Sequence, residues 1–200
     1  VKISNISNEF QIVVISNEKY LTLEKSKNVE GYTTHYRDDP FFIDPRNKKL
    51  GSRAIISLKK VYLSIKKLKL KLENSEKYYN LSYKLGVPQI NTRDLKEKIF
   101  GLECNFENLN GIDFKKGCYV GQENTARMKL KNKLRRRLVA LKSEKKLNIG
   151  SDVNYKGIKI GTILISEPYP FALIKLIDPD FSEFKDKDLI VDNNTSKIVR

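Results

Sequence analysis

Residues 116–123 read Lys-Gly-Cys-Tyr-Val-Gly-Gln-Glu, and this stretch decides how the rest of the chain is interpreted. Gly117 directly precedes Cys118, and Gly121 follows it by three residues. Glycine adopts positive φ angles readily and lets the backbone pass close to a ligand. The pattern therefore indicates a cysteine on a turn that a ligand can approach.

The surroundings of Cys118 favour its thiolate form. A helix is predicted to begin soon after it, and a helix N-terminus favours negative charge. Lys115 and Lys116 lie just before it and act in the same direction. A thiolate binds soft metals or attacks electrophiles. The alternative interpretation is a small buried hydrophobe, because free cysteines are among the most buried residues.

The run from Lys116 to Glu123 resembles the signature K-G-C-[YF]-x-G-Q-E of the YgfZ family and matches every fixed position. Arg127 falls where that family has an arginine after the motif. Glu103 and Asn105 resemble the E-x-N that precedes it. The match is long and has few free positions, so a chance occurrence is not expected.

Segments further upstream resemble the same family. Asp44-Pro45-Arg46, with Leu50-Gly51-x-Arg53, resembles its D-P-R…L-G-x-R stretch. Gly86-Val87-Pro88 resembles its G-[IV]-P turn. The resemblance covers residues 1–178, and its specific positions lie within 44–53 and 86–127.

The resemblance implies an α+β fold. A folate-binding domain like the glycine cleavage T protein, which is an aminomethyltransferase, is followed by a small β-barrel. We place the T-protein-like domain at residues 1–133 and the barrel at residues 134–200. Family members usually begin with a further subdomain that helps to form the folate pocket. This sequence starts where that subdomain has ended, so the resemblance implies a folate-binding domain that lacks it.

The resemblance also implies a role in the assembly or repair of iron–sulfur clusters, with an indirect contribution to tRNA thiomodification. Cys118 is the implied catalytic or redox thiolate and a transient ligand of a [2Fe–2S] cluster. Such clusters normally take four protein ligands, so the others must come from a partner, a second copy or a small thiol. The implied partners are an iron–sulfur carrier or scaffold protein and the client iron–sulfur enzymes.

Tetrahydrofolate is the implied cofactor, and independent turnover by this chain is not expected. The motif and its flanks supply the residues expected to bind the cofactor: Lys116, Gly117, Tyr119, Gly121, Gln122, Glu123, Arg127, Glu103 and Asn105. Cys104 is not part of the signature and is predicted to be a buried structural thiol.

Local patterns predict several elements in the first half of the chain. Apolar runs indicate a buried strand at Phe10–Ile15 and a second strand at Ala54–Leu58. The stretch from His35 to Gly51 has two prolines and is interpreted as an extended loop. Residues 61–72 fit both a helical stripe and strand alternation, with helix preferred. A further helix is predicted at Glu76–Leu85, stopped by Gly86 and Pro88.

Two short helices and a set of strands are predicted further along. One helix is capped by Asn91 or Thr92 and runs through Ile99. The other runs from Val120 or Gln122 to Leu130. Short apolar runs separated by turn residues indicate a small sandwich or barrel. These runs are 138–141, 153–155, 158–165 and 171–177.

The net charge of +15 arises from 39 basic and 24 acidic residues. A surplus of this size attracts polyanions, such as nucleic acid, an anionic membrane or a polyglutamylated cofactor. Lysine greatly outnumbers arginine and asparagine is abundant, which is also typical of a genome rich in A and T. The densest basic cluster, Arg135-Arg136-Arg137, fits either weak contact with tRNA phosphate or a solvated strand entry.

The remaining composition narrows the classes of protein. Two cysteines cannot build a disulfide framework, which indicates a reducing compartment: the cytoplasm, or the mitochondrial matrix in a eukaryote. A single histidine, His35, argues against a Ser-His-Asp triad or a multi-histidine metal site. No run approaches the roughly 18 apolar residues of a membrane span, so no membrane partner is expected.

Two other functions remain as alternatives. A true aminomethyltransferase would need a folate held against a carboxylate in the N-terminal region, and the T protein lacks the K-G-C-Y signature. A basic RNA-binding module would rest on the charge alone, because no aromatic-rich RRM strand accompanies it.

Overall fold

The computed structural model describes residues 2–130 and 134–199. The chain divides into two compact units, Val1–Asn74 and Ser75–Arg200. The predicted domain boundary, between 133 and 134, falls at the edge of a segment outside the described residues. The division of the chain into domains 1–133 and 134–200 therefore stays a prediction.

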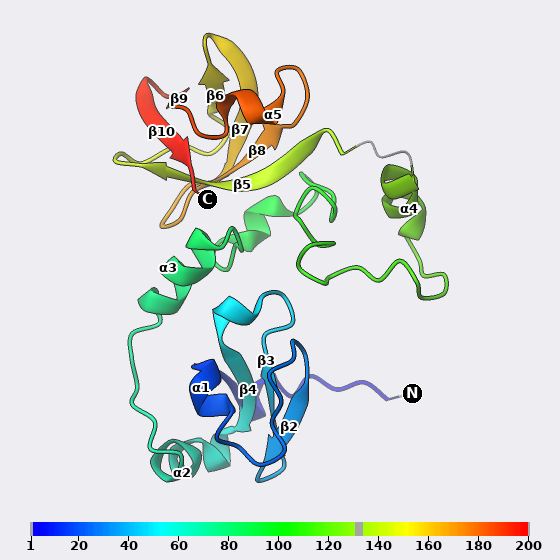
Figure 1. Cartoon of the computed structure of the whole chain (residues 1–200), viewed down its shortest axis with the longest axis vertical. Coiled ribbons are helices and arrows are strands. Elements are labelled where there is room, and N and C mark those ends of the chain that lie inside the picture. The colour runs from blue at the N-terminus through cyan, green and yellow to red at the C-terminus, as the bar shows by residue number, and fades with distance from the viewer. Residues whose placement is uncertain (1, 131–133, 200) are drawn as a thin grey trace. The chain divides into compact units, whose positions relative to one another are not determined.

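The N-terminal unit is a four-stranded antiparallel sheet with the order β1-β4-β3-β2 (Figure 1). Its core lies on one face of the sheet and includes Tyr20, Phe41, Ala54 and Ile56, which are fully buried. The elements of this unit are η1 (Ser7–Glu9), β1 (Phe10–Ile15), α1 (Asn17–Tyr20), β2 (Thr33–Tyr36), β3 (Asp39–Ile43), η2 (Lys48–Leu50), β4 (Ser52–Ser57) and α2 (Leu58–Lys67).

The predicted strands and the predicted helix of this unit are present, with differences in burial and length. The strands at 10–15 and 54–58 are confirmed as β1 and β4. The prediction that β1 is buried is wrong, because it is an edge strand on which Ile12 and Val14 are exposed. The preferred helix is confirmed from residue 61 to Lys67, where α2 ends. Lys69 has φ of 51°, so the helix does not continue to residue 72.

The extended loop predicted from His35 to Gly51 is also wrong, because β2 and β3 form a hairpin there. Arg37 and Asp38 at its tip have φ angles of 53° and 71°. Two successive positive φ angles produce the twist that a two-residue hairpin needs, although glycine or asparagine usually supplies them. Pro40 pairs with His35 and lies outside the register with β4, so its missing N–H removes no bond from that ladder.

The C-terminal unit contains a closed six-stranded barrel with the order β10-β5-β8-β7-β6-β9 (Figure 1). The fold is therefore α+β, with one barrel and a separate sheet, as the sequence predicted at this level. The elements of this unit are α3 (Glu76–Lys84), η3 (Thr92–Leu95), α4 (Gln122–Leu130), β5 (Arg136–Ser143), β6 (Asp152–Tyr155), β7 (Ile158–Ile165), β8 (Phe171–Lys175), α5 (Phe181–Phe184), β9 (Leu189–Val191) and β10 (Asn194–Ile198).

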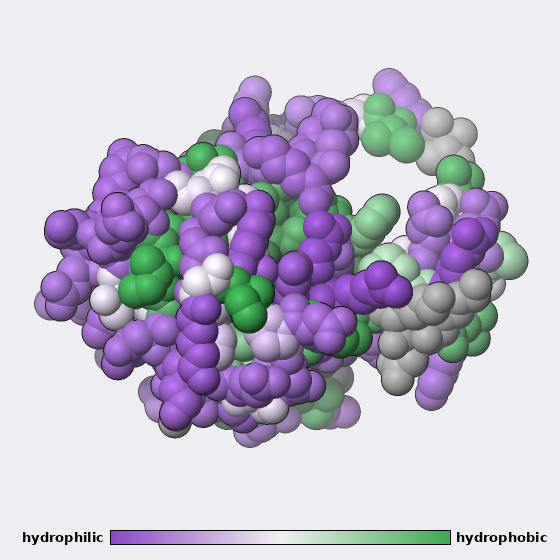
Figure 2. Space-filling model, turned by 90° about the horizontal axis from the view of Figure 1, so that it is seen from above, coloured by the Kyte–Doolittle hydropathy of each residue, from purple (hydrophilic) through white to green (hydrophobic). Residues whose placement is uncertain are grey.

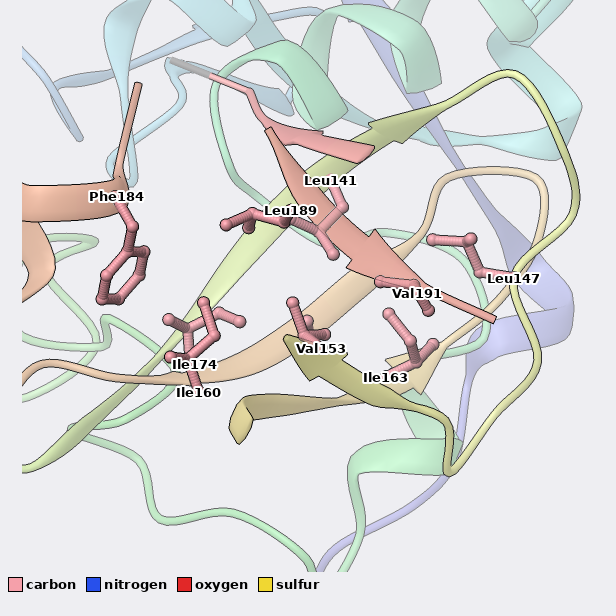
Figure 3. Close-up of a cluster of buried hydrophobic side chains, with 10 residues drawn as sticks. Leu141, Leu147, Val153, Ile160, Ile163, Ile174, Phe184, Leu189 and Val191 are labelled. Carbon is pink, nitrogen blue, oxygen red and sulfur yellow. The ribbon is translucent and has the colours of Figure 1, made fainter. Parts of the chain in front are cut away.

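The barrel buries side chains on both of its surfaces. On β8, Ala172 and Ile174 point into the interior, whereas Phe171 and Leu173 belong to a second core on the outside. A strand that is covered on both faces needs apolar residues without alternation, which explains the continuous run that predicted it. Figure 3 shows the interior cluster, with nine labelled aliphatic and aromatic side chains converging from several strands and from α5.

The outer core attaches α3 and the segment 95–104 to the barrel. Leu95 and Cys104 pack there against Phe171. Tyr83 of α3 stacks on Tyr169, with ring centroids 5.2 Å apart, and its hydroxyl donates a hydrogen bond to a backbone carbonyl of β5. Burial raises the pKa of Tyr83 to about 12. This contact anchors the helix that precedes the motif region.

The predicted helices and strands of this unit are largely confirmed. Helix α3 ends one residue before the predicted limit, followed by Gly86 with φ of 71°. Helix α4 begins at Gln122, one of the two predicted starts, and is described to Leu130, the last residue before the segment outside the described residues. The short helix predicted through Ile99 is instead a 3-10 turn that ends at Leu95. The four predicted runs are β5 to β8, and β9 and β10 complete the barrel without having been predicted.

The surface is strongly hydrophilic. On the face shown in Figure 2, hydrophilic residues dominate and hydrophobic ones occur in small separate groups. No helix among the described residues is both long and apolar enough to span a bilayer.

Candidate functional site

Cys118 lies in an exposed segment that packing does not hold. Residues 113–121 are all exposed, and Val120 is as open as in an isolated peptide, at 103% exposure. The three hydrophobic core clusters contain no residue from 105–130. The buried alternative for Cys118 is therefore wrong, and its thiol is accessible.

Local hydrogen bonds fix the turn that follows Cys118. The N–H of Gln122 donates to the carbonyl of Tyr119 at 3.3 Å, which closes a four-residue turn. Gly121 is its third residue and has φ of 84°, the value that a type II turn requires at that position. In return, the N–H of Tyr119 donates to the side-chain Oε1 of Gln122 at 3.1 Å. The same two residues thus hold the turn from both sides.

Basic and aromatic side chains surround this turn. The Lys116 ammonium lies over the Tyr119 ring, 4.9 Å from its centroid. Lys129 of α4 forms an ion pair with Glu107 and lies 5.4 Å from the centroid of the Phe114 ring. The first contact lies within the segment 113–121, and the second connects its beginning to α4.

Glu103 and Asn105 attach the preceding loop to the barrel. The Leu138 N–H donates to the Glu103 carbonyl at 2.8 Å, and the Leu138 carbonyl accepts from the Asn105 side-chain amide at 3.0 Å. Strand β10 pairs with residues 141–143 of β5, and the Val199 N–H donates to the Ala140 carbonyl at 2.9 Å. Glu103 and Asn105 continue this bonding along β5 at Leu138. Asn105 has φ of 62°, a conformation that asparagine tolerates better than most residues.

The carboxylate of Glu103 is also fully engaged in structural contacts. It is 4% exposed, accepts the Phe100 N–H at 3.0 Å and pairs with Arg136 Nε at 2.9 Å. Cys104, which lies between Glu103 and Asn105 in the sequence, belongs to the outer core and is buried as predicted. Burial, with a smaller contribution from the charge of Glu103, raises the pKa of the Cys104 thiol to about 11.

The D-P-R…L-G-x-R stretch forms a buried ionic cluster in the N-terminal unit. Asp44 is 1% exposed and accepts from Arg46 Nη2 at 2.7 Å and from Arg53 Nε at 2.9 Å. Burial alone would raise the pKa of Asp44, but the hydrogen bonds and charge of the two arginines outweigh it and hold the pKa below its ordinary value. Gly51 has φ of 87°, and a Cβ there would lie 2.7 Å from the Ile15 carbonyl oxygen.

The residues expected to bind tetrahydrofolate lie either in the motif segment or against β5. Those from 116 to 127 are exposed, apart from the partly buried Gln122. Glu103 and Asn105 are bonded to β5. A polar pocket of about 450 Å³ in the C-terminal unit is lined by other residues: Asn91, Asp94, Lys146, Asn148, Ile149, Ser166 and Glu167. Folate binding by this chain therefore stays a prediction.

The basic cluster 135–137 lies where β5 begins. Arg136 is paired with Glu103, and Arg137 is partly buried opposite Ile174 of β8. Arg135 is exposed, and its carbonyl accepts the Leu176 N–H at 2.8 Å. The cluster is therefore built into the barrel wall, and contact with tRNA stays a prediction.

The ligands available for a metal are few. Within residues 2–130 and 134–199, no three histidine, cysteine, aspartate or glutamate side chains come together to hold a metal ion. Cys118 thus offers one soft ligand without a second one from a described cluster. Shared ligation of a cluster by this residue stays a prediction.

Comparison with known proteins gives relatives that are named for iron–sulfur cluster assembly. No family model matches the chain. It is 30% identical over 151 residues to the iron-sulfur cluster assembly factor IBA57 homolog, mitochondrial, of Dictyostelium discoideum, covering 69% of the chain and 34% of that protein. It is 35% identical over 96 residues to the protein of the same name from Neurospora crassa, covering 48% of the chain and 21% of that protein.

A mammalian relative has the same name. The chain is 32% identical over 124 residues to the iron-sulfur cluster assembly factor IBA57, mitochondrial, of Mus musculus, covering 62% of the chain and 32% of that protein. The chain therefore spans about a third or less of the length of these curated relatives. Its homologues include proteins named for iron–sulfur cluster assembly, whereas the more specific YgfZ type is not distinguished by these matches.

Proposed function

We propose that the protein is a factor in iron–sulfur cluster assembly or repair, in which Cys118 is a transient ligand of a [2Fe–2S] cluster passed between proteins. The observation that carries the proposal is the accessible thiol directly before a turn that local hydrogen bonds hold in place. The names of the relatives support the same role. The cluster is cargo in this proposal, not a resident cofactor.

The number of ligands requires a shared site. A [2Fe–2S] cluster normally takes four protein ligands. Cys118 supplies one, and the buried Cys104 is held in the outer core with its pKa raised to about 11, which disfavours the thiolate that metals need. An iron–sulfur carrier or scaffold protein, a second copy or a small thiol supplies the rest. A thiol that projects from an unpacked segment is sterically suited to such sharing.

Charge around the thiol favours an anionic cargo. Lys115 and Lys116 precede Cys118, and helix α4 begins four residues after it with its positive end toward the segment. A cluster ligated by thiolates carries net negative charge, so these groups attract it. The contact of Lys116 with the Tyr119 ring keeps one ammonium beside the turn.

Anaerobic reconstitution with a [2Fe–2S]-loaded carrier protein tests this proposal. The chain alone is expected to retain no stable cluster, whereas chain and carrier together give a mixed complex with visible absorption and circular dichroism of a [2Fe–2S] centre. Cys118→Ser should abolish that complex, because the hydroxyl is a poor cluster ligand. Cys104→Ala, which removes the other thiol, should leave it intact. A stable cluster on the isolated chain would contradict the shared-ligand mechanism.

Three further aspects belong to the proposal. A mitochondrial location, the alternative to the cytoplasm, is supported by the names of the relatives. Folate dependence and the indirect link to tRNA thiomodification rest on the motif resemblance. No step of the proposed mechanism uses folate.

A further inference from the structure

An accessible thiol needs something to hold it in place if packing does not. The segment 113–121 is exposed throughout and takes no part in the three cores. Orientation of Cys118 must therefore come from local contacts of its own segment. Two such contacts lie next to it: the turn between Tyr119 and Gln122, and the stacking of Lys116 on Tyr119.

The turn has two hydrogen bonds of different kinds. The bond from the Gln122 N–H to the Tyr119 carbonyl uses backbone atoms only, so it survives any substitution except proline. The bond from the Tyr119 N–H depends on the side-chain carbonyl of Gln122. That N–H belongs to the peptide that joins Cys118 to Tyr119. The Gln122 side chain thus restrains the peptide bond immediately after the thiol-bearing residue.

A glutamine suits this task for an electrostatic reason. Its Oε1 accepts a hydrogen bond without carrying charge. A carboxylate in the same place would accept the bond equally well but would add negative charge close to a thiolate. An isosteric apolar side chain would remove the acceptor and leave the Tyr119 N–H to water. Substitution by a carboxylate or by an apolar side chain therefore tests separately whether the acceptor or the absence of charge matters.

We propose that Gln122 is a positioning residue for Cys118: its side-chain carbonyl holds the Cys118–Tyr119 peptide and thereby presents the thiol in one orientation to an incoming cluster carrier. This inference rests on the proposed function of Cys118. Lys116 restrains the same unit from the other side through the Tyr119 ring, 4.9 Å from its ammonium. The motif then consists of one reacting residue and a scaffold of neighbours that hold it.

Two variants test the proposal in the full chain. Gln122→Met keeps the shape of the side chain and removes the acceptor, whereas Gln122→Glu keeps the acceptor. Solvent exchange of the Tyr119 amide, measured by NMR, should be about fivefold faster in Gln122→Met and close to wild type in Gln122→Glu. The denaturation midpoint should be unchanged in both, because the segment contributes to none of the cores. Gln11→Met, on the exposed side of β1, is the matched control and should change neither quantity.

Yield of the mixed cluster with the carrier protein supplies the functional readout. We expect Gln122→Met to lower that yield several-fold and Gln122→Glu to restore most of it, at constant stability. Wild-type yield from Gln122→Met, in an assay where Cys118→Ser fails, would overturn the positioning role while leaving the function of Cys118 intact. If Cys118→Ser also gives wild-type yield, the proposed function itself fails and the positioning role fails with it.

Discussion

Gly161→Val is expected to prevent the barrel from closing. Gly161 lies on β7 opposite Ile174 of β8 and Val153 of β6. A Cβ at this position would lie 2.6 Å from the Leu173 carbonyl oxygen and 3.1 Å from the Ile174 Cα. Both are backbone atoms of the neighbouring strand, so relief requires the strands to separate. Overpacking of this kind costs typically 1–3 kcal/mol for buried methylenes, and we expect about 3 kcal/mol or more here.

Urea denaturation followed by far-UV circular dichroism measures this effect. Gly157→Asn is the matched control, because Gly157 lies in the turn between β6 and β7, has φ of 78° and has open space around its Cα. Asparagine tolerates that conformation, so the control should lose less than about 1 kcal/mol. A wild-type midpoint for Gly161→Val would show that β7 and β8 are not packed as described.

Asp44→Ala is expected to destabilise the N-terminal unit by about 2–3 kcal/mol. The substitution removes a carboxylate that is 1% exposed and that pairs with both Arg46 and Arg53. Loss of one partner from a buried ion pair typically costs about 3–5 kcal/mol. Arg46 and Arg53 are about a quarter exposed, so water compensates part of the loss. Hydrogen exchange of peptides from β3 and β4, measured by mass spectrometry in the whole chain, localises the effect to this unit.

The same cluster predicts a pH dependence with a definite sign. The folded-state pKa of Asp44 is lowered, so its contribution to stability is complete above the unfolded-state value of about 3.9. That contribution declines as the pH falls further, through the folded-state pKa. The difference in stability between wild type and Asp44→Ala should therefore be constant from neutral pH to about pH 5 and shrink below about pH 4.

A control at an exposed carboxylate separates this effect from general acid denaturation. The side chain of Asp38, in the β2–β3 turn, is 99% exposed, and its Oδ2 lies 3.6 Å from Lys60 Nζ. Exposed pairs of this kind contribute about 0–1 kcal/mol, so Asp38→Asn should change stability little at any pH. Equal losses from Asp38→Asn and Asp44→Ala would contradict the buried cluster.

The parts of the fold that the sequence predicted well are those with a local signal. Strands β5 and β8 have continuous apolar runs, and β7 has one at its end, residues 163–165, because each of these strands is covered on two faces. The β2–β3 hairpin was missed for an equally physical reason. Its turn uses Arg37 and Asp38 at positive φ instead of glycine or asparagine, and Pro40 in β3 is typical of a loop.

In the candidate site, too, the features with a local sequence signal were predicted and those that depend on distant residues were not. The spacing around Cys118 predicted a turn before a helix, and the structure has one with Gly121 at positive φ. The roles of Glu103 and Asn105 depend on Arg136 and Leu138, more than thirty residues later, and no local pattern indicates such pairing. Folate binding was predicted from the resemblance alone and stays a prediction.

The central claim is that the Cys118 thiol does the chemistry, and complementation tests it most directly. The gene in its natural full length, with wild-type sequence or Cys118→Ser, is expressed in a host that lacks its own relative. Activity of [4Fe–4S] enzymes and protein lipoylation are then measured, with Cys104→Ala as the thiol control. The account predicts rescue by wild type and Cys104→Ala and failure of Cys118→Ser at equal protein levels. Equal rescue by Cys118→Ser would contradict it and would leave the thiol without a role in cluster assembly.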